Sequence, residues 1–206
     1  MSTLIQLIDR ARAELVEPSP GFWSQTEFKN WCNEAHRDIC EVLRLPKADA
    51  PVVIATVDGT ELYTIAADFE TAVLVEIEDV VGSGYYRAIR AESLAHRVPS
   101  KGTPAAYFIW NQNKLGLIPV PDEVRNIRVW YAKAPTTLSA DADATVIPEK
   151  YEHLLVKYMC AQAKRKEGDN AFQTYASDYM AGRADAVTKE TEDNQSQNFA
   201  VVRYVG

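Results

Sequence analysis

Apolar residues in the first 46 positions recur every three or four residues, which is the period of an amphipathic helix. The pattern predicts two helices, separated by the helix-breaking sequence PSPG. Ser24 and Glu27 have the spacing of a capping box at the start of the second helix, and Trp23 and Phe28 have the spacing of a hydrophobic staple. The second helix therefore has a defined start, and each of the two helices has one apolar stripe that needs cover.

The period of the apolar residues changes to two over residues 51–135, which predicts β-strands. Asp58 and Gly59 separate two such runs and predict a tight hairpin turn between them. A second hairpin is predicted across residues 111–113. About six short strands with turn sequences between them indicate a compact antiparallel barrel or sandwich.

Helical periodicity returns in the last third of the chain. Pro148 suits the first turn of a third helix that ends at Gly168, and Asp169 can cap a fourth helix. One bundle made from both ends of the chain would cover the apolar stripes of all four helices. The predicted fold class is therefore α+β, with a four-helix bundle from residues 1–48 and 147–192, an inserted antiparallel β-barrel or sandwich at 49–146, and an extended C-terminal tail at 193–206.

The chain ends with apolar, strand-forming sequence. Apolar side chains would occupy both alternating faces of a strand here, and the free energy of burying them is nearly cancelled by the entropy cost of ordering the backbone. We therefore expect this tail to order where a partner offers backbone hydrogen bonds. The alternative is a last strand that packs on the chain's own β section. The candidate partner-binding residues are Phe199, Val201, Val202, Arg203, Tyr204 and Val205.

Composition and charge limit the possible functions. The chain has 206 residues, of which 47% are hydrophobic and 25% are charged, so it can bury a core without disulfides or metals. Its formal net charge of −7 argues against tight binding to nucleic acid, because gripping phosphates requires a basic surface. The sequence has no signal-peptide pattern and no apolar run near the roughly 20 residues that span a bilayer, so we expect a soluble protein made in the cytoplasm.

Residues that often carry chemistry form no catalytic motif in this sequence. The odd number of cysteines favours buried small side chains over disulfides, at Cys32, Cys40 and Cys160. The three histidines fit neither a zinc-protease nor a hydrolase motif, and surface or helix-face roles are expected for His36, His96 and His153. The Gly-Ser-Gly sequence at 82–84 is predicted to be a turn, because no phosphate-binding pattern follows it.

The acidic segment 141–152 comes nearest to a metal site. Four of its residues fall at ligand positions of a calcium-binding loop: Asp141, Asp143, Thr145 and Glu152. Val146 stands where such a loop needs glycine and Pro148 interrupts it, so a linker that caps the third helix is the preferred interpretation. Glu76 and Glu78, on one strand face, are predicted to be solvated rather than catalytic. No enzyme activity, cofactor or metal is therefore expected.

Four segments rich in aromatic residues and prolines carry a family resemblance. They are FWSQTEFKNWCNEAHRDIC, ELYTIAADF, GTPAAYFIWNQNKLGLIPVPD and IPEKYEHLLVKYMCAQAKRKEGD. In this order, spanning most of residues 22–186, they resemble the head-to-tail adaptor (connector, or head-completion) proteins of tailed bacteriophages. The sequence departs from that pattern at Ala66 and Ala67, where a proline is expected, and in the apolar tail, which varies widely in such proteins.

The resemblance implies a structural virion protein that forms a ring, usually of twelve subunits, under the portal at the capsid vertex and neck. Its helical bundle would form the ring wall, and its β section would meet the tail, nozzle or stopper protein. Double-stranded DNA would pass through the channel during ejection without specific binding, and no membrane takes part. The alternatives are another tail, stopper or fibre-attachment component, or a cytoplasmic ligand-binding or enzymatic protein.

Overall fold

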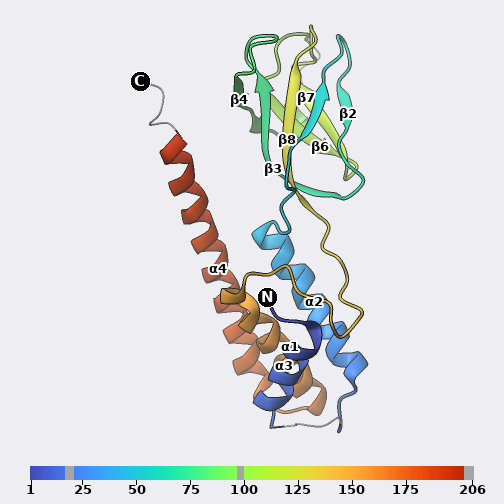
Figure 1. Ribbon diagram of the computed structural model, residues 1–206, viewed down its shortest axis with the longest axis vertical. Helices are drawn as coiled ribbons and strands as arrows, with labels where there is room; N and C mark the ends of the chain where they lie inside the picture. Colours follow the sequence, from blue (N-terminus) through green and yellow to red (C-terminus); the bar gives the residue numbers. More distant parts are fainter. Residues whose placement is uncertain (17–20, 97–99, 202–206) are drawn as a thin grey trace. The chain divides into compact units, whose positions relative to one another are not determined.

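The fold is α+β, as the sequence predicts. The computed structural model describes the backbone of residues 1–16, 21–96 and 100–201, and the side chains of this part except those of His96 and of residues 193–201. This part of the chain contains four α-helices and two four-stranded sheets (Figure 1).

The chain forms two compact units. We call them the helical unit, which combines Met1–Leu45 with the chain from Pro135 onward, and the β unit, Pro46–Ala134. The segment 135–146, which the predicted β domain of residues 49–146 includes, belongs to the helical unit. Its Leu138 is buried in the helical core, and the side chain of Asn33 exchanges hydrogen bonds of 2.8 Å with the Leu138 backbone.

Four helices build the helical unit: α1 (Leu4–Glu14), α2 (Gln25–Leu43), α3 (Glu152–Glu167) and α4 (Phe172–Val201). A 3-10 turn, η2 (Glu149–Tyr151), leads into α3, and Gly168 ends α3 in the left-handed conformation. Helix α3 contacts each of the other three helices. All four contribute buried side chains to one core, among them Leu4, Ile8, Phe28, Ile39, Leu154, Leu155, Met159, Tyr179 and Ala186.

The start of α2 confirms both predicted devices. The Glu27 N–H donates to Ser24 Oγ at 3.3 Å, and the Ser24 N–H donates to the Glu27 carboxylate at 2.9 Å. The rings of Trp23 and Phe28 meet edge-on with centroids 6.3 Å apart, and both are buried. Trp23 Nε1 also donates to the Ala163 carbonyl of α3 at 3.1 Å, so the staple ties α2 to its neighbour.

Helix α4 corrects the predicted extended tail. The backbone of residues 193–201 continues the helix, so the prediction of an extended conformation from residue 193 is wrong over this stretch. Between Phe172 and Val201 the sequence contains no proline and one glycine, and each residue added to a helix gains a hydrogen bond, so nothing stops propagation through the polar sequence. The remaining residues, 202–206, lie outside the described part of the chain.

The strands of the β unit form two open sheets rather than a closed barrel. One sheet has the order β1 (Val52–Ala55), β8 (Asn126–Lys133), β3 (Phe69–Glu78), β4 (Tyr86–Ala88). The other has the order β2 (Leu62–Thr64), β7 (Lys114–Ile118), β6 (Ala106–Trp110), β5 (Arg90–Ala91). All pairs are antiparallel except β5 with β6, which is parallel. Both sheets contribute to one core, which includes Tyr63, Val75, Ile77, Leu115, Leu117, Ile127 and Val129.

The predicted hairpin at Asp58 and Gly59 is wrong, although the turn itself exists. Gly59 has a φ of +74°, and the Thr60 N–H donates to the Val57 carbonyl at 3.0 Å. However, β1 pairs with β8 and β2 pairs with β7, so the turn connects two sheets. The Tyr63 hydroxyl accepts from the Val57 N–H at 3.0 Å and donates to the Thr60 carbonyl at 2.8 Å, which fixes this corner.

The second predicted hairpin is confirmed. Strands β6 and β7 are antiparallel and are joined across residues 111–113, with Trp110 opposite Lys114. The two turns differ because this one joins two strands that pair with each other, whereas the turn at Asp58 and Gly59 joins strands of different sheets.

Candidate functional site

The loops at one end of the β unit are joined by side-chain hydrogen bonds. Thr56, just after β1, donates through Oγ1 to the Glu123 carbonyl and accepts there from the Arg125 N–H, both at 2.7 Å. The Gly59 N–H donates to the Pro121 carbonyl at 2.9 Å. The loop between β1 and β2 is therefore fixed against the loop between β7 and β8.

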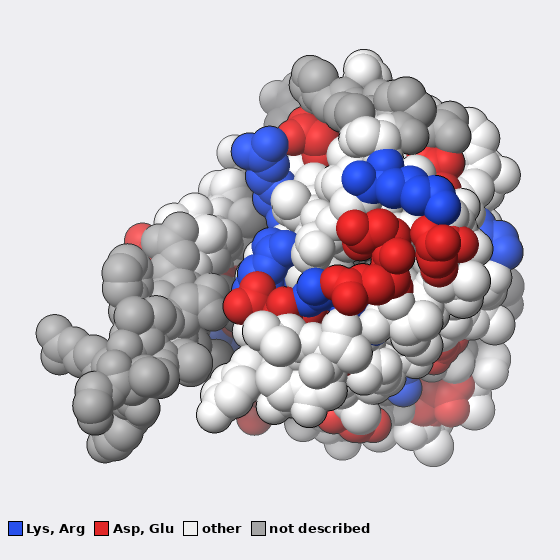
Figure 2. Space-filling view, turned by 90° about the horizontal axis from the view of Figure 1, so that it is seen from above, with Lys and Arg blue, Asp and Glu red and all other residues white. Residues whose placement is uncertain are grey.

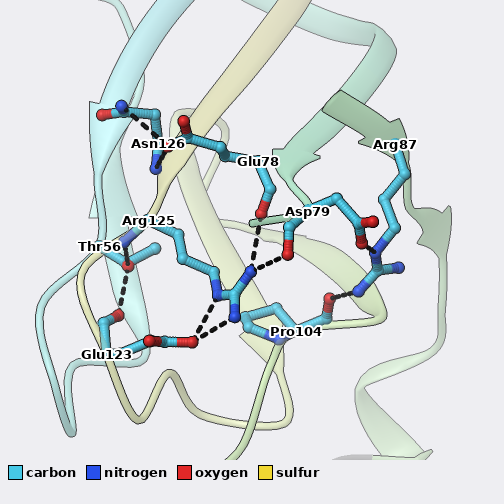
Figure 3. Close-up of polar contacts among 8 residues, drawn as sticks. All are labelled: Thr56, Glu78, Asp79, Arg87, Pro104, Glu123, Arg125 and Asn126. Carbon is cyan, nitrogen blue, oxygen red and sulfur yellow. Dashed lines mark hydrogen bonds and ion pairs between the residues drawn. The ribbon is translucent and has the colours of Figure 1, made fainter. Parts of the chain in front are cut away.

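Arg125 extends this connection to the loop between β3 and β4 (Figure 3). Its Nη1 donates to the carbonyls of Glu78, at 3.0 Å, and Asp79. Its Nε donates to the Glu123 carboxylate at 2.8 Å, and Nη2 forms an ion pair with the same carboxylate. One guanidinium therefore holds the end of β3 and the start of β8 together.

Glu78 supplies a buried carboxylate to the same network. It accepts from the Gly84 N–H at 3.1 Å and from Asn126 Nδ2 at 3.1 Å. The Gly84 hydrogen bond is the main cause that lowers the pKa of Glu78, with further donation from Asn126 and Gly82. Gly82 and Gly84 both have positive φ angles, which confirms the predicted turn and lets the loop fold back over the carboxylate.

The expectation that both strand carboxylates are solvated is wrong for Glu78, which is only 3% exposed. The reason is the returning loop, which supplies backbone donors that the strand pattern does not reveal. Glu76 also has a protein partner, since its carboxylate accepts from Trp130 Nε1 at 3.0 Å.

Two more ion pairs surround these loops. Arg87 of β4 pairs with Asp79 at 3.1 Å and donates to the Pro104 carbonyl at 2.9 Å (Figure 3). Lys101 pairs with Asp58 at 2.8 Å. Figure 2 shows that basic and acidic side chains lie next to one another on the face seen from above and form no field of one sign.

Large apolar side chains project from the same three loops. We call this set the tip patch; its residues are 52% to 79% exposed and comprise Val57, Val80, Val81, Tyr85 and Val124. Sequence reasoning missed both the patch and the network beneath it. The available signal was the run of apolar residues around the 82–84 glycines, where a solvent-exposed turn is normally polar.

The polar groups of the network bind one another. The carboxylate of Glu78 and the guanidinium of Arg125 are held by several protein partners each, so their role is to brace the loops. This arrangement can present a surface of fixed shape.

The carboxylates of the predicted calcium-like segment also have protein partners. Asp141 pairs with Lys29 at 2.7 Å, which is the main cause of its lowered pKa. Asp143 accepts two backbone hydrogen bonds, of 2.7 and 2.8 Å, and the buried Glu152 accepts from Ser2 Oγ at 2.6 Å. Within the described ranges, no group of three or more His, Cys, Asp or Glu side chains could hold a metal ion.

Other candidate residues of the helical unit are buried. Cys32, Cys40 and Cys160 are free thiols in the core, where burial raises their pKa values to about 12 and makes them poor nucleophiles. His36 lies on α2 but is 2% exposed, and burial lowers its pKa to about 4. It therefore occupies the buried face of its helix.

The predicted partner-binding residues are not brought into a described site. The backbone of Phe199 and Val201 belongs to α4, whereas the other four candidates, Val202, Arg203, Tyr204 and Val205, lie outside the described residues. As for membranes, no helix in the described part of the chain is long and apolar enough to span one.

Comparison with known proteins agrees with the resemblance found in the sequence. No curated protein matches the chain. The family model described as SU10 adaptor protein matches residues 2–203, which includes both the helical unit and the β unit. The chain therefore belongs to the SU10 adaptor protein family and is a bacteriophage head-to-tail adaptor, a structural protein.

Proposed function

We propose that this protein forms a ring of twelve subunits that joins the capsid portal to the tail at the virion neck and lines the channel for DNA. The observation that carries the proposal is the family match over residues 2–203, because it includes every element of both units. The helical unit forms the ring wall, and the β unit contacts the tail, nozzle or stopper protein.

The charge of the chain supports a channel through which double-stranded DNA passes during ejection without being held. The formal net charge is −7, so few cations are available to anchor phosphates. At the loop end of the β unit, Arg87, Lys101 and Arg125 each pair with a carboxylate. The protein acts by assembly and not as an enzyme.

We further propose that the end of the chain docks on the portal. The candidate residues remain Phe199, Val201, Val202, Arg203, Tyr204 and Val205. Since α4 runs to Val201, this segment begins within a 30-residue helix, which attaches it to the subunit. In a ring, many weak contacts of this kind act together and lock the assembly.

The test is to mix the purified protein with portal rings and to measure the complex by mass photometry and electron microscopy. A stoichiometric ring on the portal is expected, even if the free protein is a monomer. The second candidate function is a different tail or stopper component, which would bind tail proteins and leave portal rings unoccupied.

A truncated chain tests the docking segment separately. Deletion of residues 195–206 should leave the melting temperature of the free protein nearly unchanged and abolish docking on the portal. The control replaces Gln195, Ser196 and Gln197 with alanine, which keeps the apolar end and should dock normally. A truncated chain that docks like the full protein, or that melts at a much lower temperature, would contradict this assignment.

A further inference from the structure

The tip patch is an unusual concentration of exposed apolar surface. Single exposed apolar residues are normal on a soluble protein, but a contiguous apolar patch signals an interaction site. Here three separate loops contribute to it, through Val57, Val80, Val81, Tyr85 and Val124. The loops adjoin one another because Thr56 and Arg125 connect them directly.

The backbone that carries this patch is held firmly. The Val57 N–H donates to the Tyr63 hydroxyl at 3.0 Å, and the Val80 carbonyl accepts from the Ser83 N–H at 3.0 Å. Val124 lies between Glu123 and Arg125, whose side chains are bound to each other. A surface that is already ordered loses less entropy when it binds, which favours docking.

The charged side chains around the patch are paired with one another. In each of the three ion pairs the carboxylate side chain is more exposed than its cation: Asp58 60% against Lys101 56%, Asp79 61% against Arg87 39%, and Glu123 44% against Arg125 12%. The two charges of each pair cancel, so the rim is polar and carries both signs. A partner needs an apolar centre with polar groups at its edge to match it, and the phosphate backbone of nucleic acid offers no apolar centre.

We propose that the tip patch is the docking surface for an oligomeric tail-side protein, each subunit of which presents an apolar socket with a polar rim. This inference rests on the adaptor function proposed above. Five side chains cover on the order of a few hundred Å², whereas a stable one-to-one interface needs about 800 Å² per partner. One tip is therefore too small to hold a second copy or a monomeric partner, but a ring of tips that meets a ring of sockets gains by multivalency.

The experiment uses assembled portal–adaptor rings and the purified tail-side protein of the same virion. The tip variant combines Val80→Ser with Tyr85→Ser. The matched control combines Val53→Ser with Met180→Ser, because these residues are also exposed (57% and 64%) but lie on β1 and α4. The tip variant should form rings on the portal like the parent and should bind the tail-side protein about tenfold more weakly or worse, whereas the control should bind normally.

Several outcomes separate the two proposals. If the parent forms no ring on the portal, the adaptor function is wrong; the tip is then tested by displaying the full chain densely on beads, where the parent should capture the tail-side protein and the tip variant should not. If the tip variant binds as well as the control in either format, the docking surface is overturned. The docking surface would also be overturned if free monomers bound the tail-side protein as tightly as rings do. The same holds if the free protein formed dimers that the tip substitutions abolish.

Discussion

The two units of this protein use their apolar residues differently. Among the described residues, the helical unit exposes four large apolar side chains and the β unit exposes eleven, five of them in the tip patch. The apolar residues of the helices follow the helical period and are buried in one core. Those of the tip patch lie in loops, outside any strand, and are supported from beneath by polar groups. The helical unit therefore buries most of its apolar side chains in its own core, whereas the loop end of the β unit leaves five of them exposed.

The largest expected effect comes from the helical core. Phe28 is fully buried and contacts both Trp23 and Trp31. Phe28→Ala should therefore lower the free energy of unfolding by about 3 to 5 kcal/mol through lost burial and a cavity. Denaturant melts measure the change. The control is Phe22→Ala, at a phenylalanine that is 64% exposed, which should cost less than about 1 kcal/mol. Equal effects of the two changes would contradict the assigned core.

The second prediction is a loss of stability in acid that originates in the helical unit. Burial lowers the pKa of His36 from 6.5 to about 4, so between these pH values the unfolded chain binds a proton that the folded protein excludes. The contribution of His36 to the free energy of unfolding is fully present above pH 6.5. It falls as the pH is lowered towards 4, by up to about 1.4 kcal/mol per pH unit. His36→Gln should remove this slope, and His153→Gln, at an exposed position on α3, should retain it. Urea melts across this pH range measure both slopes.

Features set by neighbouring residues were predictable from the sequence. The capping box joins residues three apart and the staple joins residues five apart, so Ser24, Glu27, Trp23 and Phe28 could be assigned without knowing the fold. The hairpin across residues 111–113 succeeded for the same reason, because adjacent strands pair directly.

Features set by distant residues were not predictable in this way. A turn sequence reports a change of direction, but the partner of β1 is β8, which is more than 70 positions away. Arg125 holds Glu78 across 47 positions, and no local pattern connects them. The prediction of an extended tail failed for another reason. A short apolar run fits a strand or a helix equally well until the length of the preceding helix is known.

The third prediction addresses the packing of the β unit. Gly116 of β7 lies opposite Phe108 of β6, and an added Cβ would overlap with the Phe108 ring. Gly116→Ala should lower the free energy of unfolding by about 1 to 3 kcal/mol, because the buried ring must leave its position. In the background of Phe108→Leu the same change should cost less, and the difference between the two backgrounds measures the coupling. Additive effects would show that the ring does not exclude a side chain there.

The smallest expected effect is at the tip patch, where Tyr85→Ser should change the free energy of unfolding by no more than about 0.5 kcal/mol. The Tyr85 side chain is 79% exposed, so its loss uncovers little apolar surface. The backbone contacts at this position remain available, since the Tyr85 carbonyl accepts from the Asp79 N–H at 2.9 Å and its N–H donates to Ser83 Oγ at 3.2 Å. Denaturant melts of the free protein give the value. A loss above about 2 kcal/mol would mean that the Tyr85 side chain stabilises the β unit itself. The most exposed residue of the tip patch would then contribute to folding, as the apolar residues of the helical unit do, and the comparison between the two units would fail there.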